Sequence, residues 1–319
     1  MSTATLGQSN RNPPNDCVNN LVCENAEPAT IFLPPTGGRL AYQEFGSRFG
    51  FPIIYFHDSG SSRLEAKFFD RSADLKGYRI IAIDRPGIGL SKFKSSSSVA
   101  SFCEEVVQLS KWLGLHKFGL MSLGAGGSFA LTMAYSYPSL VQFHLCLGAV
   151  PGNVYNAANT SYSSEYMDVL IPFMIKMLVH IRHRLLRDRP SDYIDRLYDL
   201  LGNADKKVLA DTSIIRMLKM DQQELFRQGC EGVAQDAANC FRKLDFGLEQ
   251  IQAPVFIWQG SADSLTSRSE SEYMASRIPR ADLHRLNNRG HFFFIHHMDE
   301  IFARLKPYTQ IDSTIRLAA

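Results

Sequence analysis

Several features that define common protein classes are missing from this 319-residue chain. Its six cysteines form no C-x-x-C pair, which argues against a zinc ribbon, a dithiol redox site and a disulfide framework. No apolar secretory segment opens the sequence, so we expect reduced thiols, a cytoplasmic location and no metal or cofactor. The net charge is only +2, from 34 basic and 32 acidic residues, which predicts no nucleic-acid or membrane footprint. A small molecule is the expected partner, and the oligomeric state stays open.

A long hydrophobic run is also missing. The most apolar stretch, residues 169–181, is interrupted by Pro172, Lys176 and His180, well short of the ~20 apolar residues that a membrane span needs. Hydrophobic residues nevertheless make up 45% of the chain and charged residues 21%, which is typical of a large packed core. We therefore expect one large domain with an insertion.

Short apolar runs begin only after residue 28. Residues 1–28 are rich in Asn, Pro, Ser and Thr without apolar periodicity, and we expect a mobile leader there. The later runs are almost continuously apolar and alternate with helical periodicity, which predicts an α/β fold with a mostly parallel sheet covered on both faces. We expect eight strands, at residues 30–33, 39–45, 52–57, 78–84, 117–121, 143–150, 255–260 and 282–286. Functional groups are expected at the carboxyl ends of the strands.

The alternation of strands and helices stops between residues 151 and 252. This segment has helical periodicity and almost no strand signal, so we interpret it as a helical lid inserted into a core formed by residues 29–150 and 253–319. Its apolar first helix fits a ligand-facing wall and a helix packed on the sheet equally well. We expect lid helices at residues 165–187, 191–201, 206–219 and 222–244.

Four further patterns follow predicted strands. Residues 57–63 read HDSGSSR, residues 84–91 read DRPGIGLS, residues 255–263 read VFIWQGSAD, and residues 288–291 read NRGH. Between them, residues 118–130 read FGLMSLGAGGSFA, where a strand is expected to turn sharply into a helix. Pro and Gly in such segments favour tight loops beside a site.

Together these patterns resemble the α/β-hydrolase superfamily, in its lidded α/β-hydrolase-1 branch. The resemblance implies an eight-stranded α/β-hydrolase fold whose nucleophile elbow, G-x-S-x-G, lies at the strand-to-helix turn. In this chain Gly124 occupies the place of the nucleophilic serine, and Ser122 stands two residues earlier. Because glycine has no side chain, no acyl-enzyme can form at position 124.

The resemblance also implies the remaining site residues. Asp263 corresponds to the acid and His291 to the histidine, and the N–H groups of Ser59 and Ala125 correspond to the oxyanion hole. Asp58 replaces the usual glycine of its loop, and the sequence leaves open whether its carboxylate caps the loop or enters the site as an acid or base.

The DRPGIGLS segment is expected to be architectural. We expect Asp84 and Arg85 to form a structural ion pair there.

A histidine held by a carboxylate performs general acid–base catalysis without a covalent step. We therefore expect a non-hydrolytic enzyme in which His291 is the base, Asp263 orients it, and the Ser59 and Ala125 N–H groups polarise the carbonyl of an apolar, polyketide-like small molecule. Condensation, cyclisation, lyase and isomerase reactions of the kind found in secondary metabolism all suit this pair. Two alternatives remain: an ester or amide hydrolase that uses Ser122 as a displaced nucleophile, and an inactive ligand-binding protein.

Overall fold

The computed structural model describes residues 29–35, 37–148, 150–152, 173–181, 183 and 191–309, so the expected leader and most of the expected first lid helix lie outside the described residues. The strands are β1 (Thr30–Phe32), β2 (Leu40–Gly46), β3 (Phe51–Phe56), β4 (Tyr78–Ile83), β5 (Phe118–Leu123), β6 (Val141–Leu147), β7 (Val255–Gly260) and β8 (Ala281–Leu286). The labelled α-helices are α2 (Asp70–Lys76), α3 (Val99–Trp112), α4 (Gly127–Ser136), α6 (Ser191–Leu200), α7 (Asn203–Val208), α8 (Thr212–Leu225), α9 (Glu231–Cys240), α10 (Arg268–Arg277) and α11 (Phe294–Leu305).

The strands form one sheet in the order β1-β2-β4-β3-β5-β6-β7-β8. β1 pairs with β2 and β2 with β4 in antiparallel fashion, and all the other pairs are parallel. All eight strands expected from the sequence are present, with ends that differ by up to three residues. The prediction of an α/β fold with a mostly parallel sheet is therefore confirmed.

Alternating side chains of the central strands build two separate cores, one on each face of the sheet. Ile54 and Phe56 of β3 pack into the cluster that contains residues of α3, α4 and α10, whereas Ile53 and Tyr55 pack into the cluster that contains residues of α2 and α11. β5 is buried along its whole length. Burial on both faces explains why the parallel strands read as continuous apolar runs.

The helical segment between β6 and β7 differs in detail from the expectation. The predicted helix at 206–219 is two helices, because α7 ends at Val208 and α8 begins at Thr212, where Asp211 caps the new helix by accepting a hydrogen bond from Ser213 N. The predicted helix at 222–244 is also divided, since Gly229 has a φ of +94° between α8 and α9. Both boundaries are set by single capping or turn residues.

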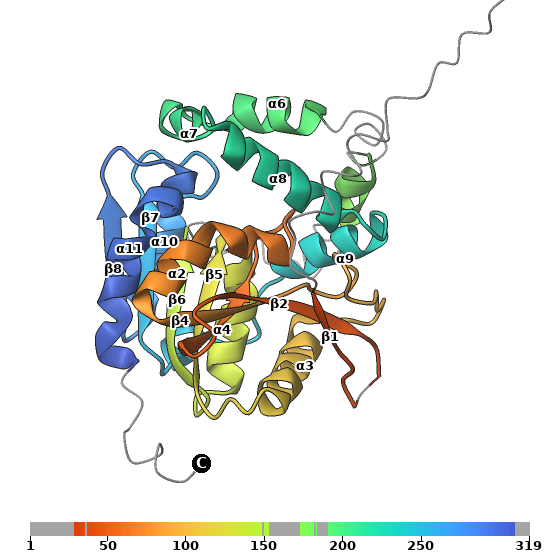
Figure 1. The fold of residues 1–319 in the computed structure, drawn as a ribbon, viewed down its shortest axis with the longest axis vertical. Coiled ribbons are helices and arrows are strands. Elements are labelled where there is room, and N and C mark those ends of the chain that lie inside the picture. The colour runs from red at the N-terminus through yellow and green to blue at the C-terminus, as the bar shows by residue number, and fades with distance from the viewer. Residues whose placement is uncertain are drawn as a thin grey trace, which may run out of the picture.

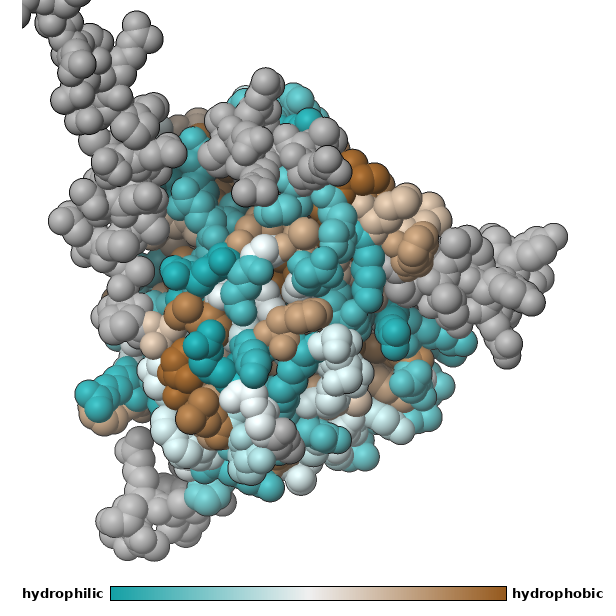
Figure 2. Space-filling model, turned by 90° about the vertical axis from the view of Figure 1, so that its right-hand side faces the viewer, coloured by the Kyte–Doolittle hydropathy of each residue, from teal (hydrophilic) through white to brown (hydrophobic). Residues whose placement is uncertain are grey.

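Helices α6, α7 and α8 lie across one end of the sheet (Figure 1). None of the helices in the described part of the chain has the length and apolarity to span a membrane. The face of the molecule shown in Figure 2 carries hydrophilic and hydrophobic residues intermixed. The space between α6 to α8 and the strand ends is where the candidate site lies.

Candidate active site

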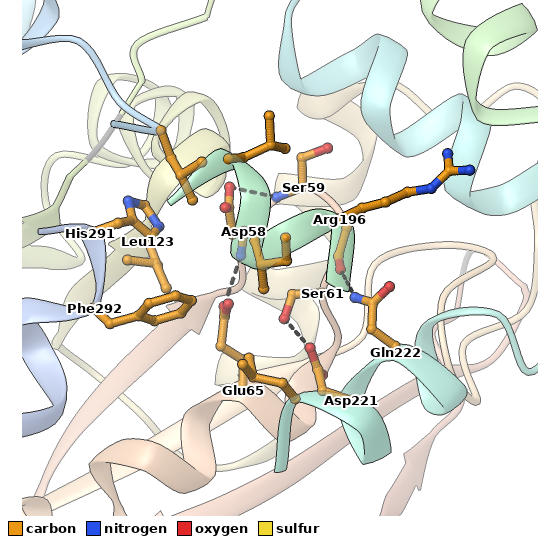
Figure 3. A pocket seen from close by; sticks show the side chains of 15 residues that line it. Asp58, Ser59, Ser61, Glu65, Leu123, Arg196, Asp221, Gln222, His291 and Phe292 are labelled. Atoms are coloured by element: carbon orange, nitrogen blue, oxygen red, sulfur yellow. Dashed lines mark hydrogen bonds between the residues drawn. The ribbon is translucent and has the colours of Figure 1, made fainter. Parts of the chain in front are cut away.

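A cavity of about 390 Å³ opens at the carboxyl ends of β3, β5 and β8, beneath α6 and α8 (Figure 3). Its wall combines acidic and imidazole side chains with a set of leucines. The lining residues are Asp58, Ser59, Gly60, Ser61, Glu65, Leu123, Arg196, Leu197, Leu200, Leu218, Asp221, Gln222, Leu265, His291 and Phe292. This volume is large enough for a small organic molecule.

His291 and Asp263 lie together, as the sequence analysis expected. His291 begins the short helical turn after β8, and its Nδ1 lies 3.0 Å from Asp263 Oδ2. Asp263 follows β7, and its carboxylate is fixed by N–H groups of Leu265 and Thr266 at 2.8 and 3.0 Å and by the Thr266 hydroxyl at 2.5 Å. A carboxylate held this firmly orients the imidazole and leaves Nε2 on the cavity side.

The pKa values of His291 and Asp263 are shifted in opposite directions. Burial alone lowers the pKa of His291, but the hydrogen bond and charge of Asp263, with the charges of Asp58 and Asp205, raise it to about 9. Burial raises the pKa of Asp263, but the hydrogen bond and charge of His291, together with the hydrogen bonds from Thr266, leave this pKa below its usual value. At neutral pH His291 is therefore an imidazolium, which can give a proton before it can take one.

Asp205, from α7, is a site residue that the sequence analysis missed. It is completely buried, and its two carboxylate oxygens accept the backbone N–H groups of His291 and Phe292 at 2.9 and 2.8 Å. A Cβ on Gly290 would lie only 2.1 Å from Asp205 Oδ2, so the glycine before His291 makes room for this carboxylate. The sequence signal was the G-H pair, but nothing in it identified the partner, which lies 86 residues away.

Gly124 forms the turn between β5 and α4, with a φ of +49°. The space above it is filled by Asp58, since an ideal Cβ at Gly124 would lie 2.2 Å from Asp58 Oδ1. The Asp58 carboxylate therefore enters the site, and it also caps its own loop by accepting the N–H of Ser59. Figure 3 shows it in the middle of the cavity wall, between His291 and Ser59.

The N–H groups of Ser59 and Ala125 are brought together, but they are already in use. Both donate to Asp58 Oδ1 at 2.7 Å, whereas the sequence analysis expected them to face a substrate carbonyl. Burial raises the pKa of Asp58, and the charge of His291 and these two N–H donors oppose that rise. The pKa of Asp58 stays above its usual value, and its carboxyl group is anchored through one oxygen beside the His291 imidazolium.

Arg85 holds the loop that carries Asp58. Its guanidinium donates to the backbone oxygens of His57 and Asp58, at 2.5 and 3.1 Å, and forms a bidentate pair with Asp236 of α9 at 2.6 and 2.8 Å. The expected pair between Asp84 and Arg85 was wrong.

Asp84 pairs instead with Arg63, at 2.6 Å. Each of the two neighbours, Asp84 and Arg85, thus points to a different segment, a choice that local sequence does not encode.

Ser122 lies outside the cavity wall. It is completely buried in β5, and its hydroxyl lies 2.8 Å from His144 Nε2 on the neighbouring strand. Burial lowers the pKa of His144 to about 3, so this histidine is neutral. The position of Ser122 gives no support to a displaced serine nucleophile.

Two further acidic residues line the cavity, and no motif in the sequence indicated either of them. These acids, Glu65 and Asp221, are both buried, and Asp221 lies on α8. Asp221 accepts hydrogen bonds from the side chains of Ser61 and Ser62 and from the backbone N–H of Ser62. Burial raises the pKa of Glu65 to about 8 and that of Asp221 to about 7. Through its hydrogen bonds from Ser61 and Ser62, Asp221 joins α8 to the loop that follows Asp58.

Among the described residues, one group of His, Cys and acidic side chains is close enough to share a metal ion: His180, Cys230 and Glu231. None of these three lines the cavity.

Comparison with known proteins agrees with this architecture. The model of the family described as alpha/beta hydrolase fold matches residues 59–297. A 2-hydroxy-6-oxononadienedioate/2-hydroxy-6-oxononatrienedioate hydrolase of Burkholderia vietnamiensis is 25% identical over 255 residues, which cover 75% of this chain and 80% of the relative. A hydrolase of the same description from a Pseudomonas species is 26% identical over 122 residues, covering 37% of this chain and 42% of that relative, less than half its length.

Solved structures show the same fold. A thermophilic esterase from Thermogutta terrifontis has a TM-score of 0.67 at 18% identity, with coverage of 88% of this chain and 98% of the esterase. The enol-lactonase from Burkholderia xenovorans LB400 has a TM-score of 0.67 at 14% identity, with coverage of 88% and 99%. The chain belongs to the α/β-hydrolase fold family, and is thus a member of this enzyme superfamily.

Proposed function

We propose that this protein catalyses proton transfer on a carbonyl-containing small molecule, with Asp58 as the base and His291 as the acid, and without a serine nucleophile. The observation that carries the proposal is the position of the Asp58 carboxylate, whose Oδ1 is held by the Ser59 and Ala125 N–H groups in the space above Gly124. These are the groups and the space that a hydrolase of this family uses for its oxyanion and its serine.

The anchoring of Asp58 assigns a role to each of its oxygens. Oδ1 is occupied by two N–H donors, and Oδ2 is the oxygen left to accept a proton from substrate carbon. Breaking that C–H bond moves its electron pair into a C=C bond, and the proton on His291 Nε2 passes to the carbonyl oxygen to give an enol. The reverse transfers return the proton to the same or another carbon.

These roles differ from the sequence-based expectation, in which His291 was the base. The change follows from charge: with a pKa of about 9, His291 is protonated at neutral pH and suits the acid role, while Asp263 stabilises the imidazolium. Positioned acid–base groups contribute roughly 10²–10⁴-fold each to a rate. Isomerisation, dehydration, aldol-type cleavage and condensation or cyclisation all proceed through such an enol.

The comparisons favour a second candidate, hydrolysis of an enolic carbonyl compound. The curated relatives are named as hydrolases of 2-hydroxy-6-oxo dioates, and a proton moved to carbon by the same pair would prepare such a molecule for attack by water. The two candidates differ in the mass of their products, because hydrolysis adds one water and isomerisation or aldol cleavage adds none.

Solvent exchange at carbon tests the proposal. Small molecules that co-purify with the protein are identified by mass spectrometry, and the corresponding ketones, with a panel of alkyl aryl ketones, are followed by proton NMR in D2O. We expect wild-type protein to exchange the hydrogens next to the carbonyl, and Asp58→Asn and His291→Gln to lose about 10²-fold or more of that rate. Asp299→Asn, a matched change on the exposed face of α11, should leave it unchanged.

Two results would contradict the proposal. Exchange at the wild-type rate in Asp58→Asn would remove the carboxylate from the mechanism. Covalent labelling of Ser122 by a fluorophosphonate, followed by loss of activity, would restore the serine hydrolase alternative.

A further inference from the structure

Glu65 lies in the cavity wall, and its two carboxyl oxygens have different surroundings. It is 8% exposed and stands in the 3₁₀ segment that follows the Asp58 loop. Its Oε2 accepts the hydroxyl of Tyr55 at 2.5 Å and the backbone N–H of Asp58 at 2.9 Å. No hydrogen bond from the described part of the chain reaches Oε1. Figure 3 shows Glu65 below Asp58, on the same wall of the cavity.

The two donors on Oε2 determine where a proton on Glu65 resides. An oxygen that accepts two hydrogen bonds acts as the acceptor of the carboxyl group, so the proton belongs on Oε1. Burial, with the charges of Asp221 and Asp58, raises the pKa of Glu65 to about 8, so the group is mostly a neutral acid at neutral pH. Glu65 lines the cavity and contacts the backbone of the proposed base, so its O–H is available as a donor beside that base.

Resting on the function proposed above, we propose that Glu65 binds a second oxygen of the substrate by donating its Oε1–H, and that the substrate is a dicarbonyl compound. One carbonyl faces Asp58 and His291, and the other, a few bonds away, accepts from Glu65. The short separation follows from the contact of Glu65 with the backbone of Asp58 itself. Leucines 197, 200, 218 and 265 line the rest of the wall and suit an apolar remainder of the molecule.

A matched pair of ligands isolates this contact. Binding of 1-phenylpentane-1,4-dione is compared with binding of 1-phenylpentan-1-one, which has the same skeleton and one oxygen fewer, by calorimetry at pH 7. We expect the diketone to bind about five- to tenfold more tightly, the value of one buried hydrogen bond. Glu65→Gln should keep this preference, because the amide oxygen accepts from Tyr55 and Asp58 while its NH2 replaces the O–H donor.

Removal of the donor gives the opposite expectation. Glu65→Leu should bind the two ketones equally, and Glu272→Gln, an exposed change of the same chemistry on α10, should behave as wild type. Because Glu65→Leu leaves a buried N–H without its acceptor and can unfold the protein, the wild type and Glu65→Gln are also compared at pH 9. Ionisation of Glu65 there should abolish the preference in wild type only.

The pH comparison controls for neighbouring groups. Wild type and Glu65→Gln share the other titratable groups near the site, which are Tyr55, Asp58, Asp221 and His291. A difference in pH dependence between the two proteins therefore belongs to Glu65. Equal binding of the two ketones by wild type at pH 7, or no detectable binding of the diketone, overturns the inference. A third result separates the two proposals. If wild type prefers the diketone but Asp58→Asn exchanges hydrogen at carbon as fast as wild type, the proposed function is refuted and the Glu65 contact stands.

Discussion

Gly124 and Asp58 are predicted to be energetically coupled, because they compete for one space. An ideal Cβ at position 124 lies 2.2 Å from Asp58 Oδ1, whereas side-chain carbons do not approach other atoms closer than 3.0 Å. Gly124→Ala must therefore push the carboxylate off the two N–H groups that now bind it. In Asp58→Gly the same alanine meets no carboxylate.

The size of the coupling follows from these contacts. The φ of +49° at position 124 costs any residue other than glycine about 1 kcal/mol, with or without Asp58. Displacing the carboxylate loses hydrogen bonds from Ser59 and Ala125, each worth about 1.5–3 kcal/mol where one partner is charged. We expect Gly124→Ala to cost about 4–7 kcal/mol in the wild-type background and about 1 kcal/mol in Asp58→Gly, a coupling of about 3–6 kcal/mol.

Urea unfolding of wild type, the two single variants and the double variant measures the coupling free energy directly. Additivity within about 0.5 kcal/mol would refute the packing of Asp58 over Gly124. Serine at position 124 extends the test: Gly124→Ser alone should resist a fluorophosphonate, because Asp58 occupies the N–H groups of Ser59 and Ala125, whereas Gly124→Ser with Asp58→Gly should label. Labelling of the single variant alone would contradict the account.

Three further outcomes are expected. Asp205→Ala should lower the free energy of unfolding by about 2–4 kcal/mol, because two buried N–H groups lose their acceptor, and it should slow exchange at carbon. Asp205→Asn should have a smaller effect. An Asp205→Ala variant as stable as wild type in chemical denaturation would contradict this. Ser122→Ala should change the exchange rate less than about twofold, and a large loss would return Ser122 to the mechanism. Stability should fall as pH rises, because the folded pKa values of Glu65 and His291, about 8 and 9, exceed the unfolded values of 4.5 and 6.5. In unfolding titrations at a series of pH values, Glu65→Gln should reduce the loss of unfolding free energy between pH 4.5 and 8, and His291→Gln should reduce it between pH 6.5 and 9. An unchanged dependence on pH in either variant would exclude that group as the cause.

The fold could be predicted because its signals are local. Short apolar runs identified every strand, and those of the central strands are continuous because both faces are covered; the chain order of the motifs placed Asp263 and His291 in one site. Helix boundaries in the segment between β6 and β7 were less accurate. Asp211 and Gly229 set those boundaries, and neither interrupts the apolar periodicity on which the prediction relied.

The details of the site could not be predicted because they depend on contacts between distant segments. The direction of the Asp58 carboxylate is decided by the space that Gly124 leaves, 66 positions along the chain, and by the N–H of Ala125. Asp205 reaches His291 from a different helix. The raised pKa of His291 follows from its hydrogen bond to Asp263 and from the charges of these carboxylates, which is why we propose His291 as the acid and not as the base expected from the sequence.

We propose that the Asp58 carboxylate and the His291 imidazolium face one another above Gly124. Titration of the His291 ring by NMR tests it without any substrate. We expect a pKa of about 9 in wild type and a lower value in Asp58→Asn, which keeps the shape of the side chain but removes its charge. A pKa near 6.5 that is the same in both proteins would contradict it.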